Sequence, residues 1–416
     1  MRSKKILCAG AAILLAGTVS GCSVKVGTNA EPDLGTIVAE PEAPGYDKGL
    51  EVTYGEFKRE YDYAVKGAGI EDDTDPSYSD ACKTQRSTII TYLINEKIIL
   101  KKANEMGLGT LTEEEMNEVE KEYNSLIDEQ VKIYGDNADY GTVEASSVSD
   151  DDKTERGNKE FDDFLAGCDL TRDDLLTWQK NSAVTDKLIK EIGKSVDYSE
   201  AEKNYTEYQK QIETLYKESV LQYEQNGFSS VWVPEGSRMI KHILLGFDED
   251  TQDLIKSDRS KGDDEAADKL REEKAAELQD KVEEVQKKLD AGEDFNTLLM
   301  TYSSDAASSS ANPDGYLVVP NGQTYMKEFQ AAAFVPEKIG DRTVCVTDYG
   351  VHIMIYAGDA KVSEEDKKSF TDYLYDQLVN AAFSKKMDEW RAEYNYKIDY
   401  AALRLDEPAE SSDSSN

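Results

Sequence analysis

The side chains best suited to chemistry in this chain are two histidines and five cysteines. His242 and His352 are the only histidines, and each stands beside an apolar run. Cys345 with His352 would give a thiol nucleophile and its base, but Cys345 lies inside an apolar strand pattern, where a thiol stays protonated and inert. Cys82, Cys168 and Cys345 also lack the spacing of metal ligands. The sequence therefore predicts neither a cysteine nucleophile nor a metal site.

Both histidines fall on predicted strands of one module. Residues 239–245 form an apolar run that predicts a buried strand. Two further strands are expected at 342–346 and 352–356, joined by a tight turn at 348–350. The rest of the module is predicted as a charged helix at 265–290, short helices after 294 and at 329–334, and loops at 247–265 and 303–324.

Helical patterns flank this module on both sides. Apolar residues recur at helical spacing between 50 and 225, with one long helix at 199–225 and a polar stretch at 135–160 that predicts a loop. Thr112 and Glu115 have the spacing of a capping box. A last long helix follows residue 361 and has an apolar face without an obvious partner nearby. We expect it to pack back onto the N-terminal helices.

Five short motifs in the middle module carry a resemblance to a known family. They are Lys241-His242-Ile243-Leu244-Leu245, Ala291-Gly292-Glu293-Asp294-Phe295 with Tyr302-Ser303-Ser304-Asp305, Asp314-Gly315-Tyr316-Leu317, Phe329-Gln330-Ala331-Ala332-Ala333-Phe334, and Thr347-Asp348-Tyr349-Gly350-Val351-His352-Ile353. Their order and spacing over 236–360 resemble the parvulin peptidyl-prolyl isomerases, and both histidines fall on that family's two histidine positions. The resemblance implies a small antiparallel sheet surrounded by helices, and cis–trans isomerisation of X-Pro bonds.

The resemblance also implies which side chains form the site. The catalytic network would consist of His242, Asp305, Thr347 and His352, and the proline-binding pocket of Leu317, Tyr325, Met326 and Phe329. Rotation about an X-Pro bond faces a barrier of about 18–20 kcal/mol from amide resonance. An enzyme lowers this barrier by binding the twisted amide better than the planar forms. The reaction requires an apolar pocket beside a polar network, and no cofactor is expected.

The sequence departs from the family around the expected pocket. Val318 stands where the family has glycine, and Tyr325 stands where it has methionine, with Met326 one position late. These departures favour a second hypothesis, in which the module binds prolyl segments in a holdase chaperone without catalysing their isomerisation. The acidic residues 248–250 would repel a phosphorylated client, so phospho-specific isomerisation is not expected.

The helical part is similar, more loosely, to the N-terminal domains of SurA-like and PrsA-like foldases. The resemblance rests on Leu93-Ile94-Asn95-Glu96-Lys97-Ile98-Ile99-Leu100, Ala103, Gly107 and Thr112-Glu113-Glu114-Glu115. We therefore expect an α+β protein, a mostly helical chaperone domain with an inserted parvulin domain. The resemblance implies that the helical domain holds unfolded chains in an apolar cleft.

The N-terminus has the features of a bacterial lipoprotein precursor. A short basic start precedes an apolar run that is too short to span a bilayer, which is typical of a signal peptide. The following Val19-Ser20-Gly21-Cys22 resembles a lipobox, which implies cleavage before Cys22 and attachment of acyl chains to its thiol. The protein is therefore expected on the extracytoplasmic face of the cell membrane, anchored by lipid.

These patterns divide the chain into six segments. They are a signal peptide at 1–21, a flexible tether at 22–48, an N-terminal helical chaperone domain at 49–235, an isomerase domain at 236–361, a C-terminal helix at 362–405 that completes the chaperone domain, and a disordered tail at 406–416. The tether and the tail are predicted from their polar composition, which cannot bury enough apolar surface to fold.

The charge of the chain limits its partners. With 48 basic and 85 acidic residues the net charge is −37, which argues against nucleic acid. The expected partners are unfolded or partly folded secreted proteins that contain X-Pro bonds, and the membrane through the lipid anchor. A homodimer is left open. A third hypothesis, a surface lipoprotein that binds a small ligand, is disfavoured because the chain lacks a bilobal α/β strand pattern.

Overall fold

The computed structural model describes residues 31–43, 45–46, 48–70, 72–139, 141 and 147–406. The expected signal peptide and Cys22 lie outside these ranges, as does the expected tail beyond residue 406. The chain forms two compact units, one comprising the residues up to 196 and from 377 onward, the other residues 197–376. Among the described residues, every helix is too short or too polar to cross a bilayer.

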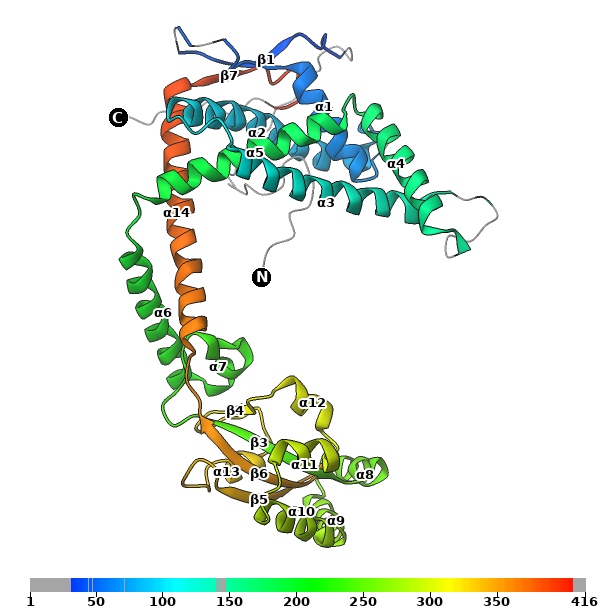
Figure 1. Ribbon diagram of the computed structural model, residues 1–416, viewed down its shortest axis with the longest axis vertical. Helices are drawn as coiled ribbons and strands as arrows, with labels where there is room; N and C mark the ends of the chain where they lie inside the picture. Colours follow the sequence, from blue (N-terminus) through cyan, green and yellow to red (C-terminus); the bar gives the residue numbers. More distant parts are fainter. Residues whose placement is uncertain are drawn as a thin grey trace. The chain divides into compact units, whose positions relative to one another are not determined.

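Unit 1 is built mainly from helices around one apolar core. The helices are α1 (Tyr54–Gly67), α2 (Ser79–Glu105), α3 (Glu113–Asn137), α4 (Asp150–Gly167), α5 (Arg172–Gly193) and most of α14 (Glu364–Tyr394) (Figure 1). Thr112 caps α3 in the predicted capping box with Glu115. Phe383 and Met387 of α14 are buried in the same core as Ile98 of α2. The apolar face of the last helix therefore packs onto the N-terminal helices, as predicted.

A small antiparallel sheet in unit 1 corrects the prediction of a flexible tether. Strand β1 (Ile37–Pro41) lies between β2 (Val52–Thr53) and β7 (Tyr396–Ile398). Val38 and Ala39 are each only 1% exposed. The tether prediction for 22–48 is therefore wrong from residue 37 onward. The apolar run of β1 is too short to show the alternation of a strand, and its main strand partner is more than 350 residues away in sequence.

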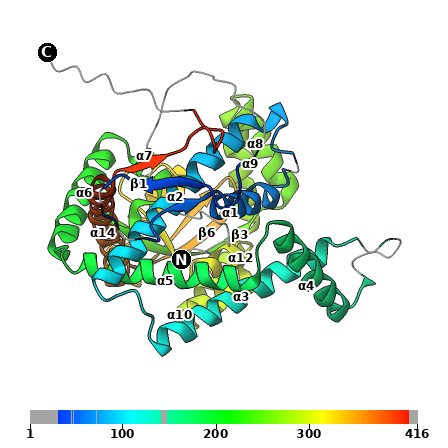
Figure 2. The ribbon, with the colours of Figure 1, turned by 90° about the horizontal axis from the view of Figure 1, so that it is seen from above.

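The predicted loop at 135–160 is also wrong, because most of it is helical. Helix α3 continues to Asn137, and α4 begins at Asp150, where the side chain of Ser149 caps its first turn. The two helices pack closely and project together from the rest of unit 1 (Figure 2). Gly157 permits this approach, since a Cβ there would lie 2.0 Å from the carbonyl oxygen of Val131. The polar sequence faces solvent on a two-helix arm.

Unit 2 contains an antiparallel sheet that confirms the predicted strands. The strand order is β4-β3-β6-β5, with β3 (Arg238–Gly246) and β6 (Gly350–Asp359) at the centre, and β4 (Tyr316–Val318) and β5 (Arg342–Thr347) at the edges. Its helices are α6 (Tyr198–Glu218), α7 (Val220–Asn226), α8 (Glu249–Ser260), α9 (Asp264–Glu277), α10 (Gln279–Asp290), α11 (Phe295–Tyr302), α12 (Ala306–Ala311) and α13 (Lys327–Ala332), with the first turns of α14.

Four predictions in unit 2 require correction. The expected loop at 247–265 contains α8, which Asp248 caps and whose Ile255 packs in a small buried cluster. The expected helix at 265–290 is two helices that meet at Leu278, and the expected helix at 199–225 is divided at Ser219. The expected loop at 303–324 contains α12 and β4. Short polar helices with only one or two buried residues leave little periodic signal in a sequence.

The compact units do not coincide with the expected domain boundaries. Unit 2 begins at residue 197 instead of 236, and its second boundary falls within α14 instead of at 361/362. The cause is an aromatic cluster in which Tyr205 of α6 and Tyr223 of α7 pack with Val319, close to β4. The tyrosine-rich helices therefore belong with the sheet of unit 2.

Candidate active site

The two histidines meet on one face of the central strand pair. His242 on β3 is paired with Met354, and His352 on β6 is paired with Leu244, so the histidines are diagonal neighbours on the same face. The Nδ1 atoms of the two rings are 2.9 Å apart, and the rings are stacked with centroids 5.0 Å apart. Both side chains are buried.

Two further predicted residues extend this pair into a chain of hydrogen bonds. Asp305, just before α12, places Oδ2 3.0 Å from Nε2 of His242. Thr347, at the end of β5, places Oγ1 2.8 Å from Nε2 of His352. The structure thus brings together the four residues of the predicted network. Tyr316 on β4 joins them, because its hydroxyl donates to Oδ2 of Asp305 at 2.9 Å.

The network has a self-consistent arrangement of protons. The Asp305 carboxylate only accepts, so Nε2–H of His242 donates to it and Nδ1 of His242 is left as an acceptor. His352 then donates from Nδ1 and accepts at Nε2 from the Thr347 hydroxyl. The Thr347 oxygen in turn accepts the backbone N–H of Tyr349 at 3.2 Å. In this arrangement both rings are neutral, because a second proton on either imidazole would face a donor that already points toward it.

The electrostatics of the site agree with neutral imidazoles. Burial lowers the pKa of His242, although the Asp305 charge opposes this effect. Burial and the neighbouring His242 lower the pKa of His352 to about 3. Burial raises the pKa of Asp305, but hydrogen bonds from Ser308 and Tyr316 and the contact with His242 outweigh it and leave that pKa lowered. At neutral pH the site therefore holds one carboxylate and two uncharged rings.

Aromatic rings surround the two imidazoles. The ring of Phe329 on α13 meets both histidines edge to face, with centroids 5.3 Å from each. Tyr325 lies 5.2 Å from Phe329, and Tyr316 lies 5.2 Å from His242. Met326 packs against the same cluster. An apolar aromatic wall thus stands beside a polar network, which is the arrangement that binding a proline ring next to a polarised amide requires.

Leu317 lies outside this site, and Tyr316 takes its place. Side chains alternate between the two faces of a strand, so Tyr316 and Val318 share one face of β4 and Leu317 the other. Val318 is fully buried with Phe329, whereas Leu317 packs in the cluster formed by α6 and α7. The expectation that Leu317 lines the pocket is therefore not met. Tyr316 had been part of the Asp314–Leu317 motif, but only the strand register reveals which of its side chains faces the histidines.

A tight turn between β5 and β6 places Thr347 and His352 next to each other. Strands β5 and β6 are joined at 348–350, and Gly350 has a φ of +147°. A Cβ at Gly350 would lie 2.2 Å from the carbonyl oxygen of Leu245 on β3. Glycine is therefore required for β6 to begin beside β3 and to place His352 opposite the end of that strand.

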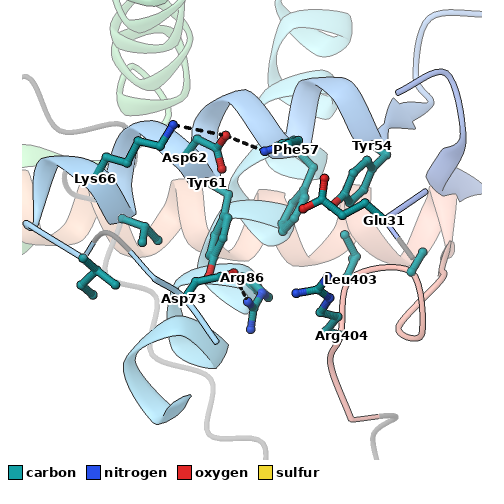
Figure 3. A pocket seen from close by; sticks show the side chains of 14 residues that line it. Glu31, Tyr54, Phe57, Tyr61, Asp62, Lys66, Asp73, Arg86, Leu403 and Arg404 are labelled. Carbon is teal, nitrogen blue, oxygen red and sulfur yellow. Dashed lines mark hydrogen bonds and ion pairs between the residues drawn. The ribbon is translucent and has the colours of Figure 1, made fainter. Parts of the chain in front are cut away.

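Unit 1 has a separate cavity of about 170 Å³ along α1. The side chains of Phe57 and Tyr61 hang from α1 toward Arg86 (Figure 3), and their rings stack with centroids 5.7 Å apart. Arg86 lies over the Tyr61 ring at 4.8 Å and forms an ion pair with Asp73. Seven of the fourteen residues that line the cavity are charged, so its lining is mixed polar and apolar.

Comparisons with known proteins identify relatives of this segment and of longer parts of the chain. Residues 232–382 match the family model described as a PPIC-type PPIase domain. The foldase protein PrsA of Geobacillus kaustophilus is 36% identical over 106 residues, which cover 25% of this chain and 34% of that protein. PrsA of Clostridium botulinum strain 657 is 23% identical over 318 residues, covering 74% of this chain and 72% of that protein. The crystal structure of PrsA from Bacillus subtilis aligns with 85% of this chain and 93% of its own, at 19% identity and a TM-score of 0.23.

The matched segment contains the whole sheet of unit 2 and every residue of the hydrogen-bonded network. The protein therefore carries a peptidyl-prolyl isomerase domain of the PpiC, or parvulin, type. Beyond this domain, the chain is similar to the PrsA foldases over about three quarters of its length, at 23% identity.

Proposed function

We propose that the protein is a lipid-anchored, extracytoplasmic foldase that isomerises X-Pro bonds in secreted proteins and holds their unfolded chains. The observation that carries this proposal is the buried network from Asp305 through both histidines to Thr347, beside the ring of Phe329. The lipobox sequence at Cys22 supports attachment to the outer face of the membrane. A homodimer stays a prediction.

The isomerase reaction follows from the surroundings of the site. Rotation about an X-Pro bond breaks amide resonance, so the twisted amide has less charge separation than either planar form. Apolar walls from Phe329 and Tyr325 would favour this less polar state over the planar states. The network fixes both imidazoles in one orientation beside these walls, so the site requires no rearrangement while the bond rotates.

The direct test is the isomerase activity of the untagged soluble protein from Ser23 onward, on an unphosphorylated X-Pro peptide in a protease-coupled assay. We expect the wild type to accelerate isomerisation and His242→Ala to lower kcat/KM about a hundredfold. Arg342→Met, which breaks an ion pair with Asp290 elsewhere in unit 2, is the control and should keep full activity. A folded wild-type protein without activity would refute isomerisation.

The second hypothesis, a holdase with an inactive parvulin domain, is favoured by the side chains that fill the pocket. Val318 is fully buried against the cluster that contains Phe329, and Tyr325 occupies space beside the same ring. The discriminating measurement is suppression of aggregation of an unfolded client by wild type and by His242→Ala. If both suppress aggregation equally and neither isomerises the peptide, the holdase hypothesis replaces the foldase proposal.

Lipid attachment has its own test in cells. Cys22→Ala should abolish incorporation of labelled palmitate and move the protein from the membrane fraction to the soluble fraction. Cys8→Ala, a cysteine within the expected signal peptide, is the matched control and should remain acylated. A Cys22→Ala protein that still incorporates palmitate would contradict the proposed anchor.

A further inference from the structure

Two arginines lie behind the isomerase site, on helices α8 and α9. Arg259 holds Asp348 with two hydrogen bonds, from Nε at 3.1 Å and from Nη2 at 3.0 Å. Arg271 lies 3.3 Å from the same carboxylate, and its Nη1 also donates to Oε1 of Glu328 at 2.9 Å. Asp268 bridges the two arginines, at 2.6 Å from Arg259 and 2.9 Å from Arg271.

The two outer acids are the sequence neighbours of site residues. Asp348 directly follows Thr347, which ends the hydrogen-bonded network, and Glu328 directly precedes Phe329, whose ring meets both imidazoles. Arg271 therefore joins the β5–β6 turn to the start of α13 through one guanidinium. Its side chain is 14% exposed and that of Asp348 is 19% exposed, so this pairing is better shielded from water than an ordinary surface ion pair.

A third arginine fixes the opposite end of α13. Arg238 on β3 donates to the carbonyl oxygens of Ala333 at 3.0 Å and Pro336 at 2.8 Å, and it stacks over the Tyr356 ring at 4.4 Å. Helix α13 is thus held at its C-terminal end by the sheet and at its N-terminal end by Arg271. Without Arg271, the end that carries Phe329 would lose its tie to the turn that carries Thr347.

We propose that Arg271 is a positioning residue for X-Pro isomerisation, because it sets the placement of Phe329 relative to Thr347 and the two histidines. The proposal rests on the isomerase function proposed above. Displacement of one wall of a binding site by about 1 Å can lower activity by as much as a hundredfold. The geometry assigns Arg271 no contact with substrate, and its effect passes through Glu328 and Asp348.

The test compares Arg271→Met and Glu328→Gln with Arg342→Met in the full soluble chain. Arg271→Met should lower kcat/KM about tenfold, mainly through kcat, while Glu328→Gln, which weakens only the α13 contact, should lower it about threefold. Arg271→Lys should recover part of the loss, since lysine can reach one acid but cannot bridge two. Arg342→Met should keep wild-type activity at similar thermal stability. If Arg271→Met does not fold, the kcat/KM of Glu328→Gln tests the proposal in its place.

A second readout does not depend on activity. The untagged chain has only two histidines, and both lie in the site, so the two imidazole Cε1–H signals in a ¹H–¹³C NMR spectrum report the network directly. We expect both signals to shift in Arg271→Met and to stay in place in Arg342→Met. A folded Arg271→Met protein with unchanged histidine signals and unchanged kcat would overturn the proposal. An inactive wild type would instead refute the isomerase function, and the histidine signals would still test the positioning.

Discussion

His242 and His352 in unit 2 and Glu60 in unit 1 are buried to a similar degree, at 6%, 5% and 5% exposure, but their surroundings differ. Every ring nitrogen of the two histidines has a hydrogen-bond partner. By contrast, Oε2 of Glu60 has no hydrogen-bond partner among the described residues. The histidine network of unit 2 is therefore complete, although Ser237, Ser309 and Gln330 of the same unit each have a buried oxygen without a partner among the described residues, as Glu60 has in unit 1.

Helix packing explains the position of Glu60. It lies on α1 and faces Glu96 of α2, whose Oε1 already accepts hydrogen bonds from Asn181 and Tyr92. Burial, the largest cause, raises the pKa of Glu60, and the charges of Glu96 and Asp174 act in the same direction, whereas that of Arg59 lowers it. The net result is a pKa of about 8. Glu60 is thus protonated at neutral pH. Burial disfavours the charged form of the buried group in both units. Because this raises the pKa of an acid and lowers that of a histidine, the stabilities of the two units depend on pH in opposite directions.

The largest expected effect is in unit 1. The pKa of Glu60 is raised on folding, so its contribution to stability is complete below about pH 4.5 and is lost as pH rises toward 8. We expect unit 1 to lose about 4 kcal/mol of unfolding free energy between pH 5 and pH 8, and Glu60→Gln to remove most of this loss. The measurement is urea unfolding of a Trp232→Phe background, in which Trp178 and Trp390 report unit 1. Glu129→Gln, exposed on α3, is the control and should keep the wild-type slope.

Unit 2 should show the opposite slope. The pKa of His352 is lowered on folding, so its stabilising contribution is present above about pH 6.5 and is lost as pH falls toward 3. We expect unit 2 to lose about 2 kcal/mol between pH 6.5 and pH 5. Trp232, in a Trp178→Phe/Trp390→Phe background, reports this transition. Stabilities of the two units that fall together in acid would contradict the comparison.

A smaller effect is expected from the end of the network. Thr347→Val keeps the side-chain shape but removes the hydroxyl that donates to Nε2 of His352. The buried nitrogen is left without a donor, and we expect kcat/KM to fall about tenfold. Thr347→Ser restores the hydroxyl and should restore most of the activity in the same assay. Equal activity of Thr347→Val and wild type would show that the network does not need this bond.

The smallest effect is expected from Tyr316→Phe. This change removes a hydrogen bond that stabilises the Asp305 carboxylate, so the pKa of Asp305 rises. We expect kcat/KM near pH 7 to fall about threefold. The acid limb of the pH–activity profile should also move to higher pH, because Asp305 is protonated earlier as pH falls. Leu317→Ala, on the other face of β4, is the matched control and should leave the acid limb in place.

Much of unit 2 could be predicted from the sequence because its signals are local. Apolar runs of strand length predicted β3, β5 and β6, and the resemblance of the motifs around the two histidines to the parvulin family implied their place in the site. The pairing of these strands then made the histidines diagonal neighbours. Asp305 and Thr347 followed from their motifs, since each lies within a few residues of an element that the sheet positions directly.

Other features depended on contacts between distant residues. Strand β1 has a buried face only because residues 52–53 and 396–398 pair with it. Tyr316 faces the histidines, and Leu317 faces away, only through the register of a three-residue strand. Arg271 reaches Asp348 and Glu328 from α9, which lies in a stretch expected to be one continuous helix.

The sequence by itself thus determined the class of fold, the main helices and the three longer strands of unit 2, because hydrophobic periodicity is a property of neighbouring residues. The four residues of the hydrogen-bonded network were predicted from the resemblance of short motifs to the parvulin family. Only the tertiary structure decided which side chains surround that network, how α13 is held in place, and that Glu60 is buried beside Glu96. Burial and hydrogen-bond satisfaction depend on which residues distant in sequence come into contact, and a local sequence pattern does not contain that information.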